Sequence, residues 1–185
     1  MTEFAIHTID SAPAASTDIL RAVEKKYGFV PNLLGELSAA PVALKAYVTL
    51  NDLLSQTSFS AVEQQLILAT ASIANNCEYC VAAHSGGLKM AGLADEELDA
   101  LRSGRRLKDG KLEALRVFVT AIVANRGWVK QSELQQFLDA GYTQAQVLEA
   151  LVGVSMKTLS NYANHIADTP LDVKFAPFAW EPASA

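Results

Sequence analysis

The two cysteines of the chain, Cys77 and Cys80, stand three residues apart, and His84, one of three histidines, follows four residues later. Thiols at i and i+3 can close a short disulfide, and an imidazole at i+4 from the second thiol lies on the same helix face, where it can move a proton. At a helix start, backbone N–H groups and the helix dipole favour a thiolate and lower a cysteine pKa below about 8.5. The spacing predicts a nucleophilic dithiol with a proton-transfer partner.

Two less specific interpretations of this segment stay open. In the first, both cysteines are small apolar core residues and His84 bonds a backbone carbonyl. In the second, the segment supplies three ligands to a zinc site, and Glu63 or His165 supplies the fourth. The sequence lacks the second cysteine pair of a zinc ribbon. We therefore expect no metal and no other cofactor.

Length and composition indicate one soluble domain. The chain has 185 residues, of which 50% are hydrophobic and 19% charged, as in compact globular proteins. A net charge of −5 with scattered basic residues argues against nucleic acid or an anionic membrane as partner. We expect no secretory signal, and the longest uncharged stretch, 64–77, is shorter than the roughly 20 residues that cross a bilayer. A cytoplasmic location is expected, where a C-x-x-C pair is more often catalytic or metal-binding than structural.

Apolar residues recur with helical periodicity throughout, and no segment alternates as a strand does, which predicts an all-α single domain. Ser16 is expected to cap the first long helix, and Ser60 with Glu63 forms a capping box before a charge-free run. Thr143 with Gln146 forms a second capping box, before the last long helix. Asn75 and Asn76 are expected to cap the helix that begins with the cysteines. The expected helices span about 16–27, 41–54, 61–74, 77–90, 95–104, 111–126, 132–140 and 143–168, and the tail from Leu171 is expected to be irregular coil.

Other polar residues are weaker candidates for the site. Glu63 lies about 21 Å along the axis from Cys77 in a continuous helix, so it reaches the thiols only if the chain turns sharply between them. A polar stripe at helical spacing near the end of the last helix is expected to be a solvated face; its members are Lys157, Asn161, Asn164 and Asp168. Tyr162 and His165 lie one turn apart on a neighbouring face and are candidates to line a pocket.

The segment from Glu63 through Gln65 to Ala69, with Asn75-Asn76-Cys77-Glu78-Tyr79-Cys80 and Ala82-Ala83-His84, resembles the AhpD-like alkylhydroperoxidase and carboxymuconolactone decarboxylase family. More narrowly, it is similar to the branch of uncharacterised peroxidase-related proteins. The strong resemblance covers about residues 60–104. It implies an AhpD-like helical bundle over residues 41–170, between an N-terminal helical extension, 1–40, and a C-terminal tail, 171–185, and it implies a homo-oligomer.

The resemblance also implies a peroxidase cycle. Cys80 would be the peroxidatic thiol, Cys77 the resolving one, and His84 a member of a proton relay that ends in a glutamate. Here the founding members' relay glutamate is replaced by Gln65, and their histidine between the cysteines by Tyr79. The relay is therefore intact only if Glu63 substitutes for that glutamate, whereas Gln65 and Tyr79 are candidates to bind substrate.

The first functional hypothesis is a thiol-dependent hydroperoxidase or disulfide oxidoreductase, with a hydroperoxide substrate and an external dithiol reductant. In it, Cys80 attacks the peroxide and His84 protonates the leaving oxygen. The second is a lactone decarboxylase-like enzyme in which His84 or His165 is the acid or base. The third is a redox-responsive helical module without catalytic activity, whose disulfide switches its assembly.

Overall fold

The regular elements of the chain are helices, as the periodicity predicts. The computed structural model describes residues 4–182, and this part of the chain contains no strand, which confirms the all-α class. Its elements are α1 (Ala14–Tyr27), α2 (Asn32–Leu37), α3 (Pro41–Ser55), α4 (Ala61–Ala74), α5 (Glu78–Met90), α6 (Asp95–Arg102), α7 (Gly110–Ala124), α8 (Gln131–Asp139), α9 (Gln144–Ala167) and the 3₁₀ helix η1 (Val173–Phe178).

Two predicted helix caps, at Ser60 and Thr143, are confirmed, whereas those at Ser16 and at Asn75-Asn76 are wrong. Ser60 caps α4 in a capping box, and Thr143 opens α9 in the same way. The predicted cap at Ser16 is wrong, because α1 begins two residues earlier, at Ala14. Ser16 is buried inside the helix, and its Oγ donates a hydrogen bond of 2.7 Å to the carbonyl oxygen of Ser38.

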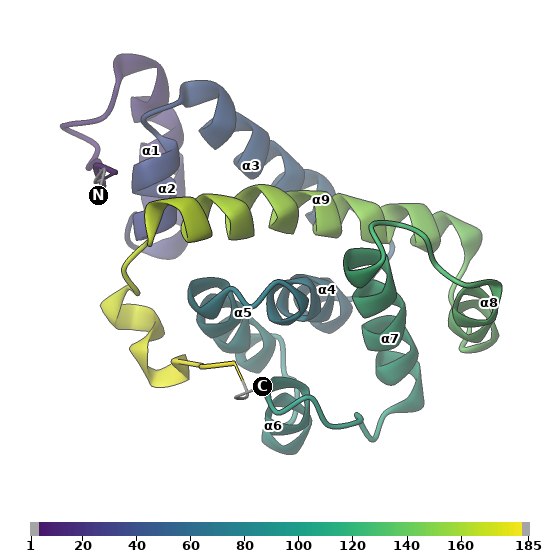
Figure 1. Cartoon of the computed structure of the whole chain (residues 1–185). Coiled ribbons are helices and arrows are strands. Elements are labelled where there is room, and N and C mark those ends of the chain that lie inside the picture. The colour runs from purple at the N-terminus through teal and green to yellow at the C-terminus, as the bar shows by residue number, and fades with distance from the viewer. Residues whose placement is uncertain (1–3, 183–185) are drawn as a thin grey trace.

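The central helix of the fold is α4. It packs against α5, α7 and α9, and α9 crosses it on one side (Figure 1). Residues 66–72 of α4 are all buried, whichever way their side chains point. Burial on every side explains why this run contains no charged residue, since a surface helix would show a polar face.

The helices α9 and α4 approach each other closely at Gly153. A Cβ placed on this glycine would lie 2.6 Å from Cγ2 of Ile67, nearer than packed carbon atoms come. The missing side chain therefore lets the two helices meet. Lys157 follows one turn later on the same face of α9, so this contact also fixes the distance of Lys157 from α4.

The N-terminal helices cover the dithiol segment. One apolar cluster joins Leu20 of α1, Leu34 of α2 and Leu44 of α3 to the two cysteines.

The predicted division into residues 1–40, 41–170 and 171–185 stays a prediction. None of the described helices has both the length and the apolar character needed to span a membrane, and the cytoplasmic location also stays a prediction.

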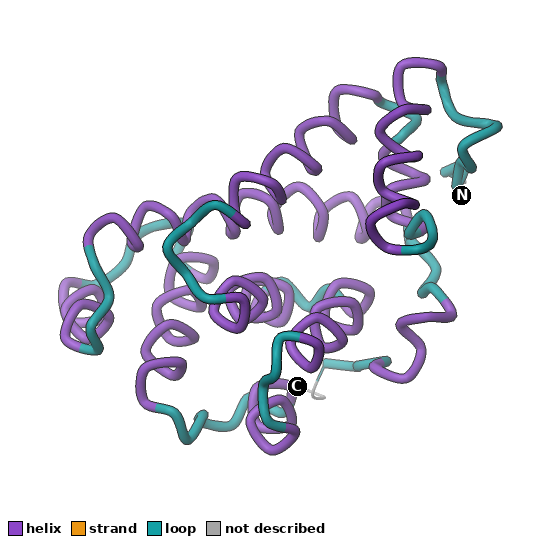
Figure 2. Tube along the Cα trace, turned by 180° about the vertical axis from the view of Figure 1, so that it is seen from behind, coloured by secondary structure: helices purple, strands orange, loops and turns teal. Residues whose placement is uncertain are grey.

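The C-terminal segment is more regular than expected. Irregular coil was predicted from Leu171, but residues Val173–Phe178 form η1, which packs along α5 (Figure 2). Arg102 holds its end by donating to the carbonyl oxygens of Phe178, at 2.9 Å, and Ala179, at 2.8 Å. The indole of Trp180 donates back to the carbonyl of Arg102 at 2.8 Å. These contacts hold the C-terminal segment in a fixed position beside α5.

We predict that Gly153→Ala destabilises the protein by about 1–2 kcal/mol. Overpacking against Ile67 costs about 1–3 kcal/mol and outweighs a gain in helix propensity of up to about 1 kcal/mol. Urea unfolding followed by circular dichroism measures the free energy of unfolding. Adding Ile67→Leu, which removes the Cγ2 branch, should recover most of the loss.

Gly110→Ala is the matched control, because Gly110 is the first residue of α7 and open space surrounds the position of its Cβ. This variant should be as stable as the wild type or more so. A Gly153→Ala protein that behaves like this control would contradict the close approach of α9 to α4.

Candidate functional site

The two thiols lie at the start of α5, where the chain turns out of α4. Asn76 has a left-handed backbone, with φ of 55°, which allows the reversal, and Cys77 is the N-cap residue of α5. The cap is therefore Cys77 and not the predicted pair Asn75-Asn76. Cys80 lies in the first turn of the helix. Both cysteines are free thiols, and each is only 1% exposed.

Cys80 lines a cavity of about 700 Å³, whereas Cys77 does not. The walls are mostly apolar and aromatic, and they come from α5 around Cys80, from the end of α1 and the loop after it, from α2, α3, α4 and α9, and from η1. They include Phe29, Leu34, Tyr47, Leu68, Met156 and Phe175. A molecule in this cavity therefore lies against Cys80 and not against Cys77.

An asparagine amide of α9 points at both sulfurs. Nδ2 of Asn164 lies 3.0 Å from Sγ of Cys80 and 3.7 Å from Sγ of Cys77. Asn161 lies nearly one turn earlier on the same face, and Asn75 donates to its amide oxygen at 2.9 Å, which orients the group. Amide N–H groups directed at a sulfur stabilise its anion more than its neutral form.

Lys157 is 1% exposed, although lysine is seldom buried. Its Nζ lies 3.0 Å from Nε2 of His84. Because an ammonium group only donates, Nε2 accepts this hydrogen bond and the ring proton resides on Nδ1. Nδ1–H then donates to Oε1 of Gln65 at 3.1 Å. A Cβ on Gly87 would overlap the Gln65 amide, so the glycine leaves room for this contact.

These contacts give the two thiols different protonation states. Burial opposes ionisation of Cys80, but a hydrogen bond from Cys77 and the charge of Lys157 outweigh it. Together with the amide of Asn161, they lower the pKa of Cys80 to about 5. The hydrogen bond to Cys80, followed by burial, raises the pKa of Cys77. At neutral pH the pair therefore consists of a Cys80 thiolate and a Cys77 thiol.

His84 is neutral in the folded protein. Burial, and then the charge of Lys157, lower its pKa well below the usual value. Its Nε2 already accepts from Lys157. The described residues also contain no cluster of three His, Cys, Asp or Glu side chains that could hold a metal ion.

The prediction that the polar stripe of the last helix faces solvent is wrong. Lys157, Asn161 and Asn164 are buried against the dithiol, and only Asp168, at the C-terminal end of α9, is exposed. Helical spacing shows which residues share a face, but it does not show whether that face meets water or another helix. One signal was available: no acidic residue lies three or four positions from Lys157, where a solvated lysine often has a partner.

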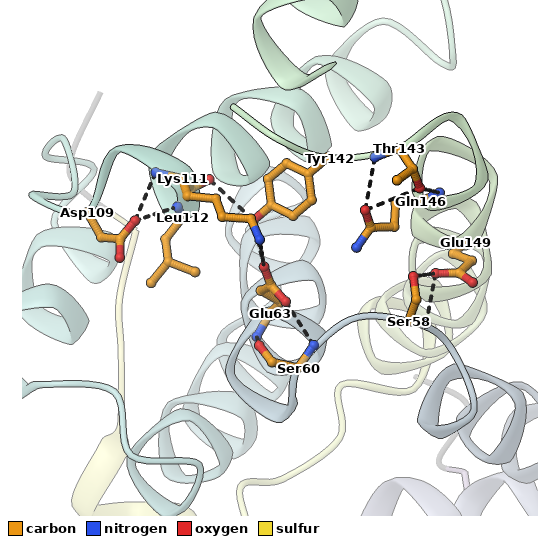
Figure 3. A network of polar contacts seen from close by, with 10 residues as sticks. All are labelled: Ser58, Ser60, Glu63, Asp109, Lys111, Leu112, Tyr142, Thr143, Gln146 and Glu149. Atoms are coloured by element: carbon orange, nitrogen blue, oxygen red, sulfur yellow. Dashed lines mark hydrogen bonds and ion pairs between the residues drawn. The ribbon is translucent and has the colours of Figure 1, made fainter. Parts of the chain in front are cut away.

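Glu63 belongs to a different network, at the start of α4 (Figure 3). Oε2 accepts from the backbone N–H of Ser60 at 2.8 Å, and Oε1 accepts from the hydroxyl of Tyr142 at 3.0 Å. Nζ of Lys111 lies 3.5 Å from the same Oε1. Burial opposes ionisation, but these contacts lower the pKa of Glu63. Glu63 therefore joins α4 to α7, and Gln65 occupies the position beside His84 instead.

Tyr79 links α5 by hydrogen bonds to α2 and to the residue before η1. Its ring lines the cavity, and its hydroxyl donates to Oδ2 of Asp172 at 2.5 Å and accepts from the backbone N–H of Leu33 at 3.4 Å. Asp172 also accepts from the backbone N–H of Asn32 at 3.2 Å, at the start of α2. Burial, and then the contact with Asp172, raise the pKa of Tyr79. Its hydroxyl is therefore engaged away from the sulfurs.

The structure brings together only some of the predicted site residues. Gln65 and Tyr79 join Cys80 and His84 at the cavity, whereas the exposed Tyr162 and His165 do not line it. Tyr47 of α3 is a lining residue that no sequence pattern marked. Burial, and then the charge of Cys80, raise the pKa of its hydroxyl, which stays a hydrogen-bond donor at neutral pH.

Residues 41–118 match the sequence profile of the Carboxymuconolactone decarboxylase family. The match covers less than half of the 185-residue chain. The match includes both thiols, Gln65 and His84, and it begins where the AhpD-like domain was predicted to begin. It ends in α7, so Lys157 and the asparagines of α9 lie outside it. No curated protein matches the chain.

Several known structures share the fold. An uncharacterized peroxidase-related protein from Ralstonia eutropha JMP134, described as an alkylhydroperoxidase AhpD core, has a TM-score of 0.82 and 20% identity over 98% of this chain and 97% of that chain. Another such protein, from Silicibacter sp. TM1040, has a TM-score of 0.78 and 16% identity over 94% and 93%. A cysteine-to-alanine variant of the debrominase Bmp8, in complex with 2,3,4-tribromopyrrole, has a TM-score of 0.81 and 15% identity over 96% of both chains. At these identities, the likeness establishes the AhpD-like fold alone.

We predict that Lys157→Met raises the pKa of Cys80 from about 5 toward the ordinary cysteine value, because it removes the nearby positive charge. The pH dependence of alkylation by iodoacetamide measures this pKa when the Cys80 peptide is quantified by mass spectrometry. The wild-type rate should have reached its plateau by neutral pH, whereas the variant's rate should still be rising there.

Lys45→Met removes an exposed lysine of α3 and is the matched control. It should keep the wild-type pH midpoint of Cys80 alkylation, and circular dichroism should show that both variants are folded. An unchanged midpoint in Lys157→Met would mean that this ammonium does not control the ionisation of Cys80.

Proposed function

We propose that the protein is a thiol-dependent hydroperoxide reductase in which Cys80 attacks the peroxide and Cys77 resolves the oxidised sulfur. The observation that carries the proposal is a thiol of pKa about 5 on the wall of an apolar cavity, with a second thiol hydrogen-bonded to it. The thiolate is the nucleophilic form of cysteine, and a neighbouring thiol traps a sulfenic acid.

In the first step, the Cys80 sulfur attacks the terminal oxygen of a hydroperoxide ROOH. The S–O bond forms as the O–O bond breaks, which leaves a sulfenic acid on Cys80 and an alkoxide RO⁻. The ammonium of Lys157 gives the alkoxide a proton, and ROH leaves. Lys157 replaces His84 as the donor of the sequence-based hypothesis, because Nε2 of His84 carries no proton. His84 and Gln65 instead orient the Lys157 ammonium.

In the second step, the Cys77 sulfur attacks the sulfur of the sulfenic acid. The S–S bond forms, the S–O bond breaks, and the hydroxyl group leaves as water with the proton of the Cys77 thiol. One hydroperoxide and two thiols thus give one alcohol, one water and one disulfide. The chain has two cysteines, both consumed in this reaction, so an external dithiol must return the two electrons.

Reductive dehalogenation is a second candidate for the same thiols. The aromatic walls of the cavity favour it, and the debrominase Bmp8 shares the fold. The Cys80 sulfur would take bromine from an aromatic ring, the ring carbon would take a proton, and the Cys77 sulfur would displace bromide to form the disulfide. One bromoarene and two thiols would give one arene, bromide, a proton and one disulfide. Bromide release from a brominated pyrrole, measured beside peroxide consumption, separates the two candidates.

The other two hypotheses draw less support from the site. Proton transfer on a lactone needs an acid or base that reaches the substrate, but Nε2 of His84 is occupied by Lys157 and His165 does not line the cavity. Lactone turnover by a Cys77→Ser/Cys80→Ser variant would favour that hypothesis. A disulfide that changes oligomer size without any turnover would favour the non-enzymatic module.

Stopped-flow mixing of the reduced protein with cumene hydroperoxide tests the proposed roles. Cys80→Ser should consume peroxide no faster than buffer does, because serine cannot supply the thiolate. Cys77→Ser should consume one equivalent and then stop, with a sulfenic acid on Cys80 that dimedone labels.

His165→Gln, on the exposed face of α9, is the control and should react at the wild-type rate. Peroxide consumption by Cys80→Ser at that rate would remove Cys80 from the mechanism. Several turnovers by Cys77→Ser in the presence of a dithiol would remove Cys77 as the resolving thiol.

The homo-oligomer implied by the family resemblance is also proposed for this chain. The outer face of α9 carries an apolar stripe at helical spacing: Leu148, Leu151, Tyr162 and Ile166, which are 67%, 41%, 54% and 72% exposed. Such a face usually marks a contact with another chain. In this proposal Tyr162 contacts the neighbouring chain and does not line the predicted pocket.

Leu148→Glu/Ile166→Glu should therefore reduce the molar mass measured by size-exclusion chromatography with light scattering to that of a monomer. Two carboxylates on the stripe would be costly to bury between chains. Gln131→Glu, at the exposed first residue of α8, is the control. If the double variant keeps the wild-type mass, α9 is not the contact.

A further inference from the structure

The cavity beside Cys80 is lined by positive charge and, within residues 4–182, by no carboxylate. The lysines that line it are Lys26, Lys89, Lys157 and Lys174. The chain as a whole carries a net charge of −5, so this sign is specific to the cavity. Lys157 belongs to the dithiol site, and Lys89 pairs with Asp95 at 2.9 Å. Lys26 and Lys174 are exposed, and neither pairs with a carboxylate of the described residues.

These two lysines flank the same short loop, although they come from distant parts of the chain. Lys26 lies in the last turn of α1, and its Nζ is 5.4 Å from the centre of the Tyr27 ring. Lys174 lies in η1, and its Nζ is 4.3 Å from the centre of the Phe29 ring and 3.4 Å from the carbonyl oxygen of Gly28. Two ammonium groups beside residues 27–29 attract an anion to this edge of the cavity.

The lining residues run in order from exposed lysines to buried reactive groups. Lys26 and Lys174 are exposed, whereas Cys80 and Lys157 are each only 1% exposed. The lining between them is largely apolar, and the volume of about 700 Å³ is in the range that holds a drug-sized molecule. A ligand with an apolar body and an anionic end remote from its reacting group matches this order.

We propose that the substrate is an anionic amphipathic hydroperoxide, such as a fatty-acid hydroperoxide, whose carboxylate lies at Lys26 and Lys174 and whose O–O bond meets Cys80. This inference rests on the proposed function, because it names the substrate class of the same thiol site. The chemistry is that of the two steps above, with the carboxylate carried on R and unchanged by the reaction. Because both ammonium groups are exposed, each contributes about two- to five-fold in affinity, and salt weakens the contribution.

The test compares linoleic acid hydroperoxide with its methyl ester, which keeps the chain and the peroxide but lacks the charge. The wild type should reduce the acid about tenfold faster than the ester, measured as the second-order rate of Cys80 oxidation at low salt. The preference should shrink at high salt. Lys26→Gln/Lys174→Gln should lose the preference by slowing with the acid while keeping its rate with the ester.

Lys25→Gln/Lys45→Gln is the matched control, because it removes the same charge from exposed lysines that do not line the cavity. It should keep the preference for the acid. Equal rates for acid and ester in the wild type would overturn the inference, and so would a preference that survives Lys26→Gln/Lys174→Gln.

Binding of linoleic acid itself, which has no peroxide group, keeps this inference separate from the proposed function. Calorimetric titration should show tighter binding of the acid than of its methyl ester, with the same dependence on Lys26 and Lys174. That result would support the anion site even if no peroxide were reduced. Equal binding of acid and ester would overturn the site even if the cysteines reduced small neutral peroxides.

Discussion

The arrangement of the candidate site depends on one buried electrostatic pairing, between the ammonium of Lys157 and the sulfur of Cys80. Alone in an apolar interior, the thiolate would take up a proton, because burial raises the pKa of a thiol. Together each stabilises the charge of the other, and the amide of Asn164 completes the solvation of the sulfur. Burial, and then the same ammonium, keep His84 neutral. A residue outside the family-matched segment thus contributes to the protonation of both Cys80 and His84.

A buried pair of charges contributes favourably only when its geometry is precise, since both ions have lost their water. Here that geometry is a property of helix packing. Asn76 turns the chain so that Cys80 lies in the first turn of α5, and Gly153 lets α9 lie against α4 with Lys157 on the facing side. The N-terminal helices then exclude water from the sulfurs. No single segment contains the site, although one segment contains both of its thiols.

The sequence allowed the prediction of what is local. The dithiol spacing, the helix that begins there and the capping boxes at Ser60 and Thr143 depend on residues within one or two turns, and the structure contains them. Lys157 and Asn164 were wrongly predicted to be solvated, because a polar stripe has the same sequence spacing whether it faces water or a sulfur. Glu63 was a candidate because a charge near the relay position is visible in the sequence, whereas its contacts with Tyr142 and Lys111 form only when α4 meets α7.

The wall formed by η1 has a dynamic consequence. No residue of η1 is fully buried. It is held by edge contacts of the Phe175 ring with Phe29 and Tyr79, by the contacts of Lys174 with the loop after α1, and by the hydrogen bonds that Arg102 donates at its end. Segments held by few contacts open locally at a fraction of the free energy needed to unfold the whole protein. The backbone amides of η1 therefore exchange with solvent long before those of α4. Because η1 supplies residues to the cavity wall, its local opening gives bulky molecules a wider path to Cys80.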